Sequence, residues 1–102
     1  KMEDEESRAA LRALAGDPDP GVAGRALASL ASGEIDEEDA QALLAHLRAG
    51  RMAEENLDPL VTLIAPYAGD EPVADAILQA ILAMELRDAR VKVRVRALLG
   101  VP

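Results

Sequence analysis

The chain has 102 residues and a net charge of −8, half of its residues are apolar, and Tyr67 is its only aromatic residue. This length fits one domain, which we place over residues 1–102. The lack of cysteine excludes disulfides and thiolate metal sites, and a single aromatic ring cannot form a stacking platform for single-stranded nucleic acid. No apolar run approaches the about 20 residues of a membrane span, and the acidic start does not resemble a signal peptide, so we expect a cytoplasmic protein without a membrane partner.

The first half of the chain predicts three helices, because Ala and Leu, which favour helices, dominate it. An acidic start and the apolar residues up to Ala15 predict the first helix. The segment 17–21 (Asp-Pro-Asp-Pro-Gly) predicts a turn, and apolar residues at helical spacing over 22–31 predict the second helix. Asp36 followed by three acids is typical of a helix start, and Gly50 is typical of a helix end.

The second half predicts three more helices. Residues 51–57 are ambiguous and have room for one short helical turn. Asp58 and Pro59 are typical of an N-cap and a first helical residue, so we predict a helix from there to Pro66. Pro72 opens a fifth predicted helix, and the last predicted segment runs from about residue 88 to residue 99, before Gly100.

The last segment fits two structures. Val91, Val95, Leu98 and Leu99 follow helical spacing, yet residues 90–96 alternate strictly between basic residues and valine, which is typical of a strand. We predict a helix, because an isolated strand would leave its backbone groups unpaired. A helix would expose Val93 to solvent, whereas a strand would imply pairing with a second chain.

Segment 11–30 reads Leu-Arg-Ala-Leu-Ala-Gly-Asp-Pro-Asp-Pro-Gly-Val-Ala-Gly-Arg-Ala-Leu-Ala-Ser-Leu. It resembles a HEAT-type repeat, in which an Asp-Pro turn joins two helices. Segment 93–100 (Val-Arg-Val-Arg-Ala-Leu-Leu-Gly) is similar to the second helix of such a repeat. The resemblance covers about a third of the chain, and residues 33–56 lack the Asp-Pro turn. It implies a scaffold for protein–protein contacts.

Short sequences that recur within the chain indicate how such units could be divided. Ala15-Gly16-Asp17 recurs as Ala68-Gly69-Asp70, and Val22-Ala23 recurs as Val73-Ala74. The chain could therefore hold two three-helix units, over 4–50 and 51–100, as in armadillo-like arrays whose units bury their faces by stacking. The alternative is a compact helical bundle. We predict an all-α fold of about six helices in either case.

Catalytic and metal-binding motifs are missing from the sequence. His46 is the only histidine, and it lacks the acidic partner and the spacing of a helical metal site, so we predict a capping or solvated role for it. Asp17 and Asp19 begin like a calcium loop, but Ala28 occupies the position of the required Glu. The acids at 36–39 and 54–58 are expected to cap helices. We therefore predict a protein that is not an enzyme and uses no metal or cofactor.

Charge is distributed unevenly along the chain. Residues 1–86 hold 18 acids and 6 bases, a net of −12, whereas residues 87–102 hold 5 bases and 1 acid, a net of +4. This basic segment is the candidate partner-binding site, and its bases are Arg87, Arg90, Lys92, Arg94 and Arg96. On a helix, the three residues Arg87, Arg90 and Arg94 would flank one side of the Val91/Val95 stripe. The simplest alternative is that the bases only balance the acidic body or the end of a helix dipole.

Three functions follow from these patterns. We predict a non-catalytic protein–protein interaction or scaffold module whose partner is either an unknown protein or a second copy of this chain. The first alternative is a nucleic-acid-binding accessory protein that uses the basic segment, against which the acidic body argues because it would repel a polyanion. The second is a helical subdomain of a larger enzyme, because residues 33–50 resemble the helical N-terminal part of phosphoribosyl-transferring enzymes.

Overall fold

A computed structural model describes residues 5–33 and 35–100, and it confirms the all-α prediction. Six α-helices and two single 3₁₀ turns make up the regular structure of these residues, which contain no strand. The bounds are α1 Glu5–Leu14, α2 Pro20–Ala31, α3 Glu37–Arg48, η1 Glu54–Asn56, α4 Leu57–Ile64, η2 Ala65–Tyr67, α5 Pro72–Leu82 and α6 Ala89–Leu99.

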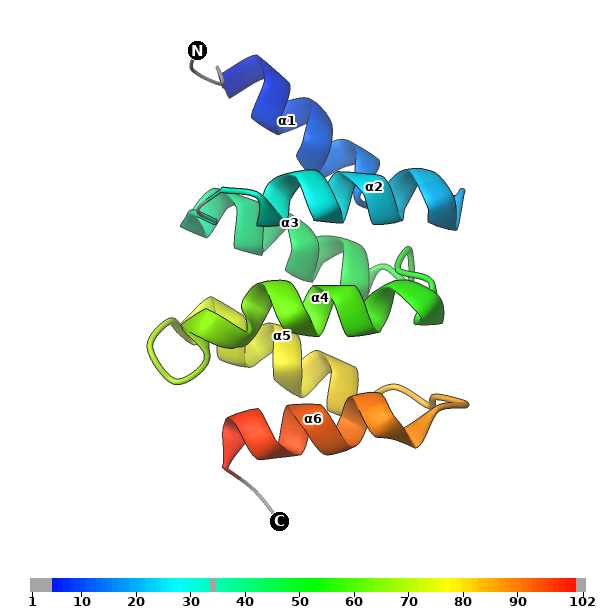
Figure 1. Cartoon of the computed structure of the whole chain (residues 1–102), viewed down its shortest axis with the longest axis vertical. Coiled ribbons are helices and arrows are strands. Elements are labelled where there is room, and N and C mark those ends of the chain that lie inside the picture. Colours follow the sequence, from blue (N-terminus) through cyan, green and yellow to red (C-terminus); the bar gives the residue numbers. More distant parts are fainter. Residues whose placement is uncertain (1–4, 34, 101–102) are drawn as a thin grey trace.

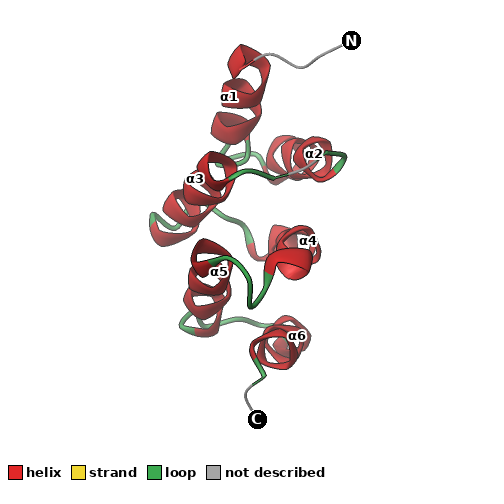
Figure 2. Cartoon of the chain, turned by 90° about the vertical axis from the view of Figure 1, so that its left-hand side faces the viewer, coloured by secondary structure: helices red, strands yellow, loops and turns green. Residues whose placement is uncertain are grey.

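The helices stack in chain order along the longest axis of the molecule, with α1 and α6 at opposite ends (Figure 1). They form two layers: α1, α3 and α5 lie in one layer, and α2, α4 and α6 lie in the other (Figure 2). Within each layer a helix contacts the next one, as α3 does with both α1 and α5, while α1 also contacts α2, and α5 also contacts α6. The result is an elongated body of 43 × 29 × 19 Å.

One continuous cluster of apolar side chains lies between the two layers. It runs from Ala15 beside α1 to Val95 on α6. The cluster includes residues on both sides of residue 50, where the sequence placed the boundary between two possible units. Its fully buried members are aliphatic, for example Leu43, Leu60 and Ile77. Because such side chains are compact, the helices can pack closely without aromatic residues.

Short polar residues set the ends of the helices, largely as the sequence predicts. Asp36 caps α3: its carboxylate accepts a hydrogen bond from the N–H of Asp39 at 2.8 Å, and the Asp39 carboxylate accepts one from the N–H of Asp36 at 3.1 Å. Asp19 caps α2 by accepting from the N–H of Gly21 at 2.9 Å, so α2 begins at Pro20, inside the predicted turn. Gly50 and Gly100 end helices with positive φ, a conformation that favours glycine.

The predicted start of the fourth helix was wrong by two residues. The turn η1 continues directly into α4 at Leu57, so Asp58 and Pro59 lie inside the first turn instead of at the N-cap. Asn56 holds the cap position, but its buried side chain donates to the carbonyl of Pro20 at 3.0 Å and makes no capping bond. The side chain of Asn56 therefore links the start of α4 to α2.

The alternating last segment is a helix. Asp88 caps it by accepting from the N–H of Arg90 at 3.0 Å, and Val91 and Val95 are buried against the body. Val93 lies on the opposite side of α6 and is 60% exposed, as a helix requires. The alternation of bases and valines therefore does not place the valines on one face.

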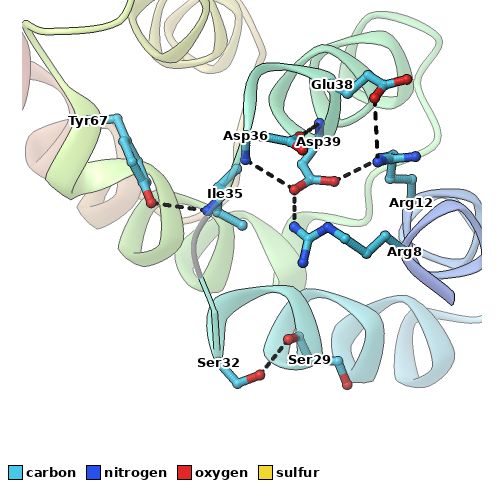
Figure 3. A network of polar contacts seen from close by, with 9 residues as sticks. All are labelled: Arg8, Arg12, Ser29, Ser32, Ile35, Asp36, Glu38, Asp39 and Tyr67. Atoms are coloured by element: carbon cyan, nitrogen blue, oxygen red, sulfur yellow. Dashed lines mark hydrogen bonds and ion pairs between the residues drawn. The ribbon is translucent and has the colours of Figure 1, made fainter. Parts of the chain in front are cut away.

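A buried carboxylate, which the sequence did not predict, joins α1 to α3 (Figure 3). Asp39 has no exposed surface, and it accepts hydrogen bonds from Arg12 Nε at 2.7 Å and from Arg8 Nη2. Burial alone raises the pKa of Asp39, but the hydrogen bonds from Arg8, Arg12 and the N–H of Asp36 outweigh burial, with help from the charge of Arg8. The pKa therefore lies below its ordinary value of 3.8, and the carboxylate is charged near pH 7.

The single histidine links the same two helices. His46 Nε2 lies 2.7 Å from the carbonyl oxygen of Arg12, which can only accept, so Nε2 carries the proton and donates to the end of α1. The imidazole covers Gly16, where an added Cβ would lie 2.3 Å from Nδ1. His46 therefore holds a helix end, in line with the capping role predicted from the sequence.

Gly16→Ala should lower the free energy of unfolding by about 1 to 3 kcal/mol, because the new methyl group would displace the His46 ring. Chemical denaturation of the variant measures this loss. Gly21→Ala is the control, since its added Cβ would meet only an Asp19 carboxylate oxygen at 3.3 Å. In a Gly16→Ala, His46→Ala double variant the glycine substitution should cost less than it does alone, and equal costs in both backgrounds would refute the proposed clash.

Candidate interaction surface

The basic segment predicted as a partner site is held on α6 by contacts at the start of that helix. The N–H of Asp88 donates to Glu54 Oε2 at 2.9 Å, which ties the N-cap of α6 to η1. Val91 and Val95 then bury one side of the helix against α4 and α5. These contacts fix which of the five basic side chains face the body.

Arg94 faces the body and links α6 to α4. Its guanidinium forms an ion pair with the Asp58 carboxylate of α4, and its Nη2 donates to Thr62 Oγ1 at 3.2 Å. Asp58, predicted as a helix cap, therefore binds Arg94 of α6, 36 residues further along the chain. Arg94 is a poor candidate for partner binding because its donors are already engaged.

Arg90 is paired locally with the residue that caps its own helix. Its Nη2 donates to Asp88 Oδ2 at 2.8 Å and its Nε to Asp88 Oδ1 at 3.0 Å; the Arg90 side chain is largely exposed and that of Asp88 is partly exposed. The side-chain hydrogen bond from Arg90, followed by the one from its backbone N–H, lowers the pKa of Asp88 to about 2. The same pairing raises the pKa of Arg90. A partner carboxylate would therefore have to compete with Asp88 for this guanidinium.

The other three bases remain available. Arg87 lies before α6, not on it as predicted, at an exposed position beside a groove that also includes Glu54 and Glu55. Lys92 is half-buried and Arg96 is exposed, and neither forms an ion pair with any residue that the structure describes. The structure therefore spreads the five predicted bases over several directions and leaves Lys92 and Arg96 on the helix itself for a partner.

An apolar strip runs along the outer side of α6 and was not predicted as part of the site. Ala89, Val93 and Ala97 are all exposed and lie four residues apart, so they share the side of α6 opposite Val91. Arg90 borders this strip on one side and Arg96 on the other. The spacing of these small apolar residues was visible in the sequence, but it has meaning only once the segment is known to be a helix.

A second hollow lies where α3 and α5 begin. This cavity of about 300 Å³ has an apolar floor that includes Ile64, and its rim carries Asp36, Glu37 and Glu71. Tyr67 lies at its side, and its Oη accepts a hydrogen bond from the N–H of Ile35 at 3.1 Å. Asp36 caps α3, and Glu37 and Glu71 occupy helix starts, where acids favour the positive end of the dipole. The cap made by Asp36 and the positions of Glu37 and Glu71 at helix starts account for these acids without a ligand.

Comparison of the chain with protein families, with curated proteins and with solved structures finds no match. Within residues 5–33 and 35–100, no three His, Asp or Glu side chains are grouped so that they could hold a metal ion. Asp17 and Asp19, which begin like a calcium loop, instead order the α1–α2 turn: Asp17 Oδ1 accepts from the N–H of Asp19 at 2.8 Å. No helix in the described part of the chain has the length and apolarity to cross a bilayer.

Proposed function

We propose that the protein is a non-catalytic interaction module of the HEAT type, and that the outer side of α6 binds an acidic protein surface. The observation that carries the proposal is the exposed strip of Ala89, Val93 and Ala97, bordered by basic side chains. Protein interfaces commonly combine an apolar centre with a polar rim, and Arg is enriched in them. Arg96, which forms no ion pair with the described residues, favours an acidic partner at this rim and speeds its encounter.

The arrangement of the helices supports the HEAT-type part of the proposal. Consecutive helices alternate between two layers and contact the next helix of their own layer, as in stacked helical repeats (Figure 2). The Asp-Pro segment that carries the resemblance, residues 17–20, leads from α1 into the start of α2. Such stacks present extended surfaces to protein partners, which is the use that we propose here.

The nucleic-acid alternative is less well supported by the charges around α6. Two of the five bases, Arg90 and Arg94, are paired with Asp88 and Asp58, and Arg87 lies beside Glu54 and Glu55. An exposed valine at the centre of the surface offers nothing to a phosphate backbone, whose binding relies on unpaired Lys and Arg. We therefore favour a protein partner.

Affinity capture with α6 variants tests the proposal. The double variant Val93→Asp, Arg96→Glu should lose, by at least about tenfold, proteins that the unaltered chain retains from a cell extract. The control variant Gln41→Glu, Arg48→Glu makes the same change in net charge at exposed positions of α3 and should retain them. Fluorescence anisotropy with random duplex DNA and single-stranded RNA is measured in parallel, at about 50 and 200 mM salt.

The outcomes separate the two classes of partner. Retention that depends on Val93 and Arg96, without nucleic-acid binding, supports a protein-binding surface. Equal retention by both double variants overturns the assignment of α6. Binding to DNA or RNA that weakens at least about tenfold with salt, and that is lost in the α6 variant, would replace the proposal with the nucleic-acid alternative.

A further inference from the structure

The hollow where α3 and α5 begin is apolar inside. Its half-buried lining residues are Ile35, Tyr67 and Val73, and Figure 3 shows Tyr67 beside Ile35. The fully buried Ile64 closes its floor. The cavity measures about 300 Å³, and apolar surface in a concave site gains free energy when an apolar group covers it. The hollow can therefore accept an apolar side chain of a partner.

The rim of the hollow is negatively charged. The start of α3 brings Asp36 and Glu37, Glu71 precedes α5, and all three residues are exposed. Glu37 and Glu71 form no ion pair with any residue that the structure describes, and the described lining includes no base. Helix starts explain why acids occupy these positions. The charge that the acids leave around the apolar hollow nevertheless favours an occupant that carries bases beside its apolar group.

The outer side of α6 has the complementary character. Val93 is 60% exposed, more than any other large apolar side chain in the described part of the chain. Arg90 and Arg96 lie three residues before and after it, so they flank it on the helix surface. Val91 and Val95 bury the opposite side of α6. Val93 therefore points away from its own body, and it can meet such a hollow only on another molecule.

We infer that the acidic surface bound by α6 is the hollow of a second copy of this chain. This inference rests on the proposed function and adds the identity of the partner. Val93 enters the hollow beside Val73, while Arg96 faces the carboxylates of Glu37 and Glu71. One contact thus covers an exposed apolar side chain with bases beside it and an apolar hollow with acids around it. Because the hollow admits few side chains, the interface is small, and association is expected between about 10 µM and 1 mM.

Changes on either surface should weaken this association. Sedimentation of the unaltered chain should show a mass that rises above 10.8 kDa between about 10 µM and 1 mM. Val93→Asp brings a carboxylate to the acidic rim, and the double variant Glu37→Lys, Glu71→Lys reverses the charge of the rim itself. Each should need at least about tenfold higher concentration to reach the same mass.

Matched controls separate a local contact from an effect of net charge. Ala28→Asp adds one acid at an exposed position of α2, and it should associate like the unaltered chain. Glu55→Lys, Glu85→Lys reverses two exposed acids outside the hollow and should associate no less than the unaltered chain. Circular dichroism of all variants checks that these substitutions preserve the fold.

Introduced cysteines locate the contact, because the chain has none of its own. An equimolar mixture of Val93→Cys and Val73→Cys, oxidised in air, should form mainly the disulfide that joins one variant to the other. A mixture of Val93→Cys and Ala28→Cys is the control and should show no such preference, since Ala28 lies on α2, away from the hollow.

Two outcomes would overturn the inference. A chain that stays monomeric at about 1 mM excludes a second copy as the partner. Disulfides formed mainly between two copies of Val93→Cys, together with association that Glu37→Lys, Glu71→Lys leaves intact, would indicate a symmetric contact between α6 helices. In either case, binding of a different acidic protein that depends on Val93 and Arg96 would leave the proposed function standing.

Discussion

Asp39→Ala should lower the free energy of unfolding by about 3 kcal/mol, which is a large share of the stability of a domain of this size. The substitution leaves two guanidinium groups, those of Arg8 and Arg12, without their shared carboxylate in a site with 19% and 11% side-chain exposure. It also removes half of the capping box of α3. Chemical denaturation measures the loss. Glu37→Ala, at the neighbouring exposed position, is the control and should change stability by less than about 0.5 kcal/mol.

The same carboxylate should make stability depend on pH in a defined direction. Because the pKa of Asp39 is lower in the folded chain than its ordinary value of 3.8, its contribution is fully present above about pH 4. The contribution is lost as the pH falls through the folded value. Denaturation curves between pH 7 and pH 2 should therefore show a steeper loss for the unaltered chain than for Asp39→Asn. If the free energies of unfolding of the two proteins fell in parallel with pH, the folded chain would not stabilise the charged form of Asp39.

Val95→Asp should destabilise the fold by at least about 3 kcal/mol, because it places an unpaired charge where Val95 has no exposed surface. The charge would lie between α6 and the helices it contacts, α4 and α5, so α6 should detach first. Loss of helical circular dichroism at a lower denaturant concentration measures the effect. Hydrogen exchange should locate the earliest loss of protection in residues 89–99.

Val93→Asp is the matched control for this prediction, since the same substitution two residues away should be nearly neutral. Val93 is largely exposed, and an acid there has basic neighbours in Arg90 and Arg96. The contrast between the two positions also tests the helix itself. In a strand, valines two residues apart share one face and would respond alike, so equal effects at positions 93 and 95 would contradict the helical assignment.

The regular part of the fold could be predicted from the sequence because its signals are local. The Asp36 cap, Pro72 at a helix start and Gly100 at a helix end all act within one turn of the chain. The start of α4 could not be predicted, because the Asn56 side chain makes no local capping bond and instead donates to the carbonyl of Pro20, 36 residues earlier. A partner that distant in sequence leaves no local pattern.

The candidate site was predictable in composition but not in geometry. The excess of bases after residue 86 identified the segment, yet the sequence could not show that Asp58 engages Arg94 or that Asp88 engages Arg90. For the same reason Asp39 resembled one of several acids at a helix start, although it is buried with Arg8 and Arg12. Pairing across helices decides which charges remain for a partner, and it depends on how the helices stack.

Amide chemical shifts offer the most direct test of whether the outer side of α6 binds protein. The isotope-labelled chain is titrated, up to about 1 mM, with an acidic protein that affinity capture retains through Val93 and Arg96. The account predicts shift changes concentrated in residues 89–97 and strongest around Val93 and Arg96, with α3 unaffected. Shift changes that spare residues 89–97, or none over the whole titration, would contradict it.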